Sequence, residues 1–106
     1  MIIEYKNGEE LKNVIENSEY CLLLVGSLGC SKCKGLATVL DKVYQQYPYI
    51  KYLIASESVV NQITKPYIIH AMSVLFYKNG IRKGLAKYLY APQAYARRIE
   101  QTLLKD

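Results

Sequence analysis

The feature that most constrains this chain is the Cys-Ser-Lys-Cys sequence at residues 30–33, which stands between an apolar run and a helical pattern. The apolar run covers residues 21–25 and breaks at the glycine-containing loop 26–29. Two thiols at this spacing on a first helical turn lie on the same side, about 5–6 Å apart at their Cβ atoms. A disulfide needs Cβ atoms about 3.5–4.5 Å apart, so a small local adjustment joins them. The spacing therefore predicts a thiol pair that can close into a disulfide.

The position of the first cysteine predicts that its thiol is the more reactive one. A helix N-terminus carries about half a positive charge and unpaired N–H groups, and both favour a thiolate. Lys32 lies inside the pair and adds positive charge. We therefore expect a lowered pKa for Cys30, tuned in part by Lys32, and a nucleophilic thiolate near neutral pH. Cys33, one turn further in, should be less exposed and act as the resolving thiol.

Two other uses of the cysteine pair are weighed against a redox role. Cys-x-x-Cys is also half of a zinc site, but a closed structural site needs four ligands, and only Cys21 and His70 remain as further cysteine or histidine. A structural disulfide is the second alternative, although so short a loop gains little stability from closure. A redox pair in a strand–turn–helix is favoured over both. No metal ligand is assigned.

Length and composition point to one small domain in a reducing compartment. The chain has 106 residues, 51% of them hydrophobic, which suits a single domain over residues 1–106 with one core. No apolar run is long enough to span a membrane, so we expect no membrane partner. Residues 1–5 lack the charged and apolar regions of a signal peptide and are typical of a strand. Three cysteines fit a reducing compartment, and we expect the cytoplasm.

The net charge of +5 raises the question of nucleic acid. Lysine and arginine are spread along the chain, and the segment 77–90 interleaves aromatic and basic residues as single-strand binders do. No recognised nucleic-acid motif accompanies the charge, so we expect no nucleic-acid partner. A basic surface favours acidic protein partners instead.

Hydrophobic periodicity and turn signals divide the first half of the chain. A strand is expected over residues 2–5, followed by a helix capped by Asn7, with Glu10 completing a capping box. The run 20–25 does not alternate, which is typical of a strand covered on both faces. After the cysteines, a helix is expected up to Pro48. Its inward stripe comprises Leu36, Val39, Leu40, Val43, Tyr44 and Tyr47.

The second half adds a strand, a helix, a hairpin and a last helix. We expect a strand over residues 50–55 and a helix over 57–64 capped by Ser56 or Ser58. Strands 74–78 and 81–88 flank Asn79-Gly80, the strongest short signal of a type I′ hairpin. Pro92 opens the last helix, which turns Tyr95, Ala96, Ile99 and Leu103 inward.

The resulting order, βαβαβαββα, predicts an α/β fold. Strands joined by helices become parallel through right-handed crossovers, and the hairpin adds an antiparallel strand at the edge. A central mixed sheet flanked by helices on both faces follows.

This order resembles that of the thioredoxin family along nearly the whole chain. The residues that carry the resemblance are the cysteine pair at 30–33, the hairpin at 74–80 and the helix after it. The resemblance implies a thioredoxin-like fold and a thiol–disulfide oxidoreductase, a protein-disulfide reductase in which Cys30 attacks and Cys33 resolves. Its partners would be protein disulfides or dithiols and an electron-donating reductase or small thiol, with no bound cofactor. We expect a monomer.

Three positions depart from the family's pattern. Gly29 stands where the family has a tryptophan before the first cysteine, and Leu24 stands where thioredoxins carry a buried acid. Met72, followed by Ser73, occupies the place of a cis-proline. Without the acid, nothing obvious takes the proton of Cys33, so resolution should slow at neutral pH. A cis bond before Met72 would cost about 2.5–4 kcal/mol, so we expect it to be trans.

The resemblance also places the substrate groove beside the thiols. Its candidate substrate-binding residues are Gly29, Ser31, Met72 and Ser73. Met72 is expected to lay a flexible apolar side chain over the thiols. His70 would lie nearby as a loop residue, and Cys21 is expected to be a small buried hydrophobe.

Two further hypotheses of different classes remain open. The departures favour, as the first alternative, a catalytically weak thioredoxin-fold adaptor or redox sensor. The second is metal or cluster binding by two Cys30–Cys33 pairs across a dimer.

Overall fold

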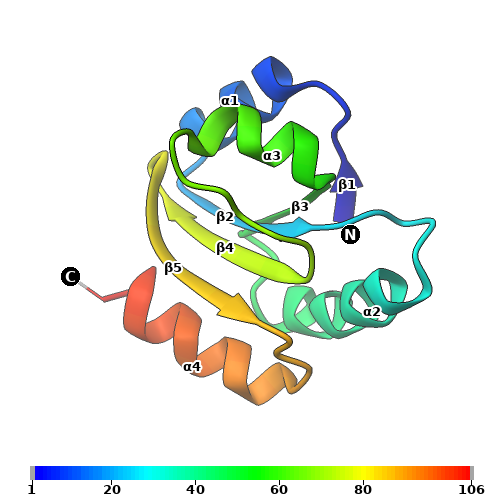
Figure 1. Cartoon of the computed structure of the whole chain (residues 1–106). Coiled ribbons are helices and arrows are strands. Elements are labelled where there is room, and N and C mark those ends of the chain that lie inside the picture. The colour runs from blue at the N-terminus through cyan, green and yellow to red at the C-terminus, as the bar shows by residue number, and fades with distance from the viewer. Residues whose placement is uncertain (1, 106) are drawn as a thin grey trace.

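The computed structural model describes residues 2–105 and shows a five-stranded sheet with helices on both faces (Figure 1). Among these residues, no helix combines the length and the apolar character needed to cross a bilayer. The elements along the chain are β1 (Ile2–Glu4), α1 (Gly8–Glu16), β2 (Tyr20–Val25), α2 (Ser31–Gln46), β3 (Lys51–Ala55), α3 (Glu57–Thr64), β4 (Ser73–Lys78), β5 (Ile81–Lys87) and α4 (Pro92–Thr102).

The sheet is mixed, with the strand order β1-β3-β2-β4-β5. Strand β3 pairs in parallel with both β1 and β2, because each connection between these strands passes through a helix. Strand β4 runs antiparallel to β2, and the hairpin places β5 antiparallel to β4 at the edge. The predicted fold class, α/β with a mixed central sheet, is confirmed.

The sheet separates two apolar cores. Helices α2 and α4 cover one face, and α1 and α3 cover the other (Figure 1). Strand β2 turns Leu22 and Leu24 to the first core and Cys21, Leu23 and Val25 to the second. Both faces of this strand are therefore buried, which explains why its sequence does not alternate.

The local signals for helix starts and for the hairpin are present in the structure. The Asn7 side chain accepts hydrogen bonds from the backbone N–H groups of Glu9 and Glu10, so it caps α1. Ser56, rather than Ser58, caps α3 by accepting from the N–H of Val59 at 3.4 Å. Asn79 and Gly80 have φ angles of 51° and 81°, as a type I′ turn requires.

The expected inward stripe of α2 needs one correction. Tyr44 is 37% exposed, whereas Tyr47 lies just beyond the helix and is buried. The Tyr44 ring contacts that of Tyr52 edge-on, with centroids 5.7 Å apart. The tyrosine therefore keeps its ring against Tyr52 while part of the side chain stays exposed.

The cysteine pair and its surroundings

The first cysteine stands at the tip of α2, where the loop from β2 enters the helix (Figure 1). The loop is fixed by hydrogen bonds from Gly26 N–H to Ala55 O at 2.8 Å and from Cys30 N–H to Ser27 O at 3.1 Å. Cys30 is the N-cap residue, with an extended backbone (φ −90°, ψ 129°), and its carbonyl accepts from Lys34 N–H at 2.9 Å. Its thiol therefore lies beside the free N–H groups of the first turn.

The two thiols differ sharply in burial. Cys30 is exposed, whereas Cys33 is 2% exposed and packs in the core between the sheet and α2. Neither is in a disulfide in this structure. This is the arrangement of an outer and an inner thiol that the spacing predicts.

Backbone groups of the helix tip lower the pKa of the Cys30 thiol. The largest cause is the nearby backbone N–H of Cys33, followed by the Cys33 side chain. The N–H of Lys32 comes next, and the positive charge of Lys32 contributes least. The expected tuning by Lys32 thus comes more from its backbone than from its ammonium group.

Burial raises the pKa of the Cys33 thiol, because a thiolate is poorly solvated inside the core. The neighbouring Cys30 raises it further, and a backbone hydrogen bond from Ser27 opposes the shift. The pKa values of the two thiols therefore shift in opposite directions, and Cys30 is the thiol that ionises more readily.

Met72 covers the inner thiol. The Cys33 Sγ–H donates a hydrogen bond to the Met72 thioether sulfur at 3.4 Å, and Met72 itself is buried. The backbone of Met72 is anchored on both sides: its N–H donates to Val25 O at 2.9 Å, and its carbonyl accepts from Tyr88 N–H at 3.3 Å. Within the described residues, the only cis bond precedes Pro66, so the bond before Met72 is trans, as expected.

The sequence reasoning missed Gly26 as a part of this site. A Cβ atom at this position would lie 2.5 Å from the Cys33 Sγ, which is closer than side-chain atoms pack. The absence of a side chain at Gly26 thus makes the space in which the inner thiol sits. A glycine at the end of a buried strand, just before a cysteine pair, is the signal that could have found it.

The other expected site residues occupy different environments. Gly29 and Ser31 flank Cys30 and are exposed, as a substrate contact requires. The Ser73 side chain is 0% exposed, and its hydroxyl has no partner among the described residues. Leu24, in the place of the family's buried acid, is also 0% exposed and packs in the same core as Cys33. The substrate role of Gly29, Ser31, Met72 and Ser73 stays a prediction.

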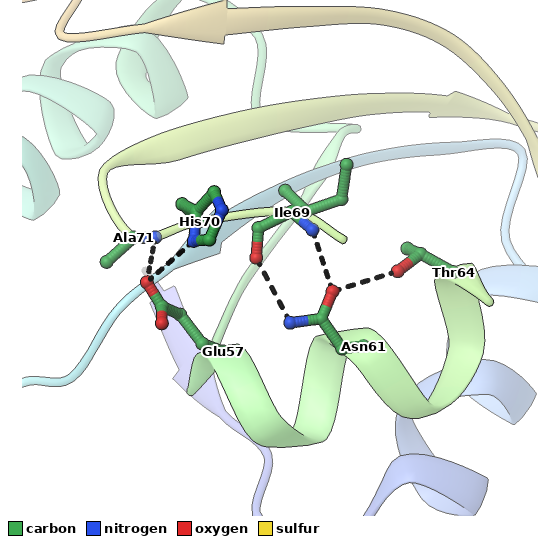
Figure 2. A network of polar contacts seen from close by, with 6 residues as sticks. All are labelled: Glu57, Asn61, Thr64, Ile69, His70 and Ala71. Atoms are coloured by element: carbon green, nitrogen blue, oxygen red, sulfur yellow. Dashed lines mark hydrogen bonds and ion pairs between the residues drawn. The ribbon is translucent and has the colours of Figure 1, made fainter. Parts of the chain in front are cut away.

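The two residues weighed as further zinc ligands lie elsewhere. Cys21 is fully buried in the core beneath α1 and α3, where burial raises its pKa. The His70 side chain is 70% exposed, and its Nδ1 lies 3.9 Å from a carboxylate oxygen of Glu57 (Figure 2). Across residues 2–105, no three His, Cys, Asp or Glu side chains converge in a way that could hold a metal ion.

Comparison with solved structures identifies the fold. Mitochondrial thioredoxin 3 of Saccharomyces cerevisiae in its oxidised form is 23% identical, with 94% of each chain covered and a TM-score of 0.74. Oxidised thioredoxin of Plasmodium falciparum is 18% identical, covering 95% of this chain and 97% of its own, with a TM-score of 0.75. A chain from work on thiol resolving in a yeast mitochondrial 1-Cys peroxiredoxin is 22% identical, with 94% of each chain covered and a TM-score of 0.75.

The class that these likenesses define is the thioredoxin fold. The chain is thioredoxin-like, and its cysteine pair stands at the start of the helix that follows the central strand. No protein-family model matches the sequence, and no curated protein matches it.

Proposed function

We propose that this protein is a thiol–disulfide oxidoreductase that uses Cys30 as nucleophile and Cys33 as resolving thiol. The observation that carries the proposal is the pairing of an exposed thiol at a helix tip with a buried thiol one turn behind it. The opposite pKa shifts of the two thiols support the same division of roles. The thioredoxin fold, whose named neighbours include oxidised thioredoxins, supports it further.

The first step uses the exposed thiolate. Cys30 Sγ attacks one sulfur of a partner's disulfide, so that a Cys30–partner disulfide forms and the partner's other sulfur leaves as a thiolate. That thiolate takes up a proton from water. The backbone N–H groups at the tip of α2 stabilise Cys30 before the attack and are free to act on the mixed disulfide afterwards.

The second step uses the buried thiol. Cys33 loses its proton and attacks Cys30 Sγ, which forms the Cys30–Cys33 disulfide and releases the second partner thiolate. Overall, two electrons and two protons pass from the cysteine pair to the partner's disulfide. A dithiol or small-thiol reductant of the cell then returns the pair to its reduced form.

The surroundings of Cys33 make the second step the slower one near neutral pH. Leu24 and Met72, which pack with Cys33, have no group that takes up a proton, because a thioether accepts a hydrogen bond without being a base. The Cys33 proton must therefore be transferred on the side of Cys33 that faces Cys30, either to the departing partner thiolate or to water.

The direct test is the reduction of insulin disulfides with dithiothreitol as electron donor, comparing the wild-type protein with Cys30→Ser. We expect the variant to lose the catalysed rate. Cys33→Ser should trap the mixed disulfide on Cys30, visible as a covalent adduct by mass spectrometry under non-reducing conditions.

The third cysteine provides a matched control. Cys21 lies in the core on the opposite face of the sheet, so Cys21→Ala should leave the rate unchanged. Equal rates for the wild-type protein and Cys30→Ser would contradict the proposal.

A thioredoxin-fold adaptor or redox sensor is the second candidate. The observation that favours it is the burial of Cys33 against Met72, in an apolar core that also contains Leu24, which slows resolution. It predicts a stable disulfide, with a reduction potential well below thioredoxin's roughly −270 mV, and negligible turnover of insulin. A potential near that of thioredoxin would exclude it.

The proposed function also implies a class of partner and a cellular compartment. We propose protein disulfides or dithiols as partners, with a monomer acting in the cytoplasm, where a reductant is at hand. The charge of +5 supports partners with an acidic surface. Raised salt should then lower the apparent affinity for such a partner more than for a neutral one.

A further inference from the structure

One asparagine on α3 fixes the loop that leads to Met72 (Figure 2). The Asn61 carboxamide oxygen accepts from Ile69 N–H at 2.7 Å, and its amide nitrogen donates to Ile69 O at 3.2 Å. A single side chain thus pairs with both backbone polar groups of one loop residue. The Ile69 side chain is buried in the core beneath α3, so this point of the loop is held by packing as well.

Other α3 side chains hold the loop on either side of Ile69. Thr64 Oγ1 donates to Tyr67 O at 2.8 Å, and the Glu57 carboxylate accepts from the N–H of Ala71, the residue before Met72. Figure 2 shows Glu57 and Asn61 in contact with the loop, and Thr64 in contact with the Asn61 side chain, along the helix. Side chains of α3 therefore hydrogen-bond to the loop at Tyr67, Ile69 and Ala71.

Met72 needs such fastening, because its backbone is in an unfavourable conformation. Its φ angle is 69°, in the left-handed region that a side chain rarely adopts. Such a residue persists only where the surrounding structure holds it. Hydrogen bonds to Val25 and Tyr88 hold Met72 itself, and Asn61 fixes the chain three residues before it.

We propose that Asn61 is a positioning residue for the thiol pair: by holding the backbone of Ile69, it keeps the Met72 thioether on the thiol of Cys33. Asn61 touches neither cysteine and acts through the loop. The inference rests on the redox function proposed above, but its test reads the reactivity of Cys33 directly and needs no disulfide substrate.

The consequence is control of access to the inner thiol. Met72 shields Cys33 and accepts a hydrogen bond that only the protonated thiol can donate. When the loop is loosened, Met72 withdraws for part of the time, and Cys33 becomes both more exposed and more easily ionised.

The test measures the alkylation of Cys33 by iodoacetamide in a Cys30→Ser background, so that the outer thiol does not compete. Peptide mass spectrometry separates labelling of Cys33 from that of Cys21. Asn61→Ala removes both hydrogen bonds to Ile69 and should speed the labelling of Cys33 by roughly fivefold or more, since the loss of one hydrogen bond already corresponds to about that factor. If this variant does not fold, Asn61→Asp keeps the acceptor, loses the donor to Ile69 O and should shift the rate in the same direction.

The matched control is Asn7→Ala, which also removes two hydrogen bonds between an asparagine side chain and the backbone. Both of these hydrogen bonds lie within the first turn of α1, so this variant should lower stability without changing the labelling of Cys33. Equal acceleration in Asn7→Ala and Asn61→Ala would mean a general loosening and would overturn the proposal.

A double variant shows whether Asn61 acts through Met72. Met72→Leu keeps the bulk of the side chain and removes its sulfur. If the proposal is right, the effects of Asn61→Ala and Met72→Leu on the labelling rate are not additive. Independent, multiplying effects would overturn it. Insulin reduction by the unmodified protein remains a separate measurement, so a failure here is distinguishable from a failure of the proposed function.

Discussion

The thioether sulfur of Met72 lies 3.4 Å from the thiol sulfur of Cys33, although 39 residues separate them in the chain. This contact joins the loop before β4 to the first turn of α2. It explains how the pair divides into a covered thiol and an exposed one, because Met72 packs against Cys33 whereas Cys30 stays exposed.

The first prediction concerns the acidity of Cys30. Because backbone N–H groups and the Cys33 thiol lower its pKa, the rate of its alkylation should reach half its maximum at a lower pH than in the urea-unfolded chain. Cys33→Ala removes the neighbouring thiol and should raise the pKa of Cys30, whereas Cys33→Ser keeps a polar side chain there and should raise it less. Identical profiles for the folded and unfolded chains would contradict this account.

The second prediction concerns the pH dependence of resolution. Burial raises the pKa of Cys33, and only its thiolate attacks, so the rate should rise about tenfold per pH unit between about pH 6 and pH 8. The step can be followed by stopped-flow absorbance, as release of thionitrobenzoate from Cys30. A rate that is flat over this range would reveal a base near Cys33 that the structure does not show.

The third prediction tests the space made by Gly26. A methyl group here would meet the Cys33 Sγ at 2.5 Å, so Gly26→Ala should destabilise the fold by about 1–3 kcal/mol. Gly35 provides the control: it lies on α2, and an added Cβ would meet nothing within 4 Å. Gly35→Ala should therefore stabilise the fold by about 0.5–1 kcal/mol. Urea unfolding would measure both changes. A change of the unfolding free energy in the same direction for Gly26→Ala and Gly35→Ala would contradict the argument.

The fourth prediction concerns two buried tyrosines. The Tyr95 hydroxyl is buried without a partner among the described residues, so Tyr95→Phe should raise the free energy of unfolding by about 1 kcal/mol. The Tyr52 hydroxyl donates to Tyr47 O at 3.0 Å, so Tyr52→Phe should lower it by about 1 kcal/mol. The two midpoints in urea should thus move in opposite directions; a loss of stability in Tyr95→Phe would show that its hydroxyl has a partner after all.

The elements that could be predicted from the sequence are those fixed by neighbours in the chain. The cap at Asn7 and the turn at Asn79-Gly80 depend on a few adjacent residues, and both stand where the sequence places them. The start of α2 at the cysteine pair follows from the same kind of local signal. Even so, Tyr44 was assigned to the inward stripe wrongly, because periodicity does not show which positions of a stripe the neighbouring elements cover.

What the sequence could not show are contacts between distant segments. The sequence suggested that Met72 covers the thiols, but not that its sulfur accepts from Cys33 or that its φ is positive. The roles of Gly26 and Asn61 depend on how β2, α2 and α3 pack, and no local pattern reports that. These positions are where the substitutions above will be most informative.

The central sheet also has a consequence for oxidative damage. Its strands stand between Cys21 and the pair at the tip of α2, and Cys21 is fully buried. While the chain stays folded, an oxidant can therefore join only one of the possible cysteine pairs. Non-native disulfides can form only in the unfolded chain. A disulfide that includes Cys21, detected after treatment with peroxide, should therefore indicate partial unfolding.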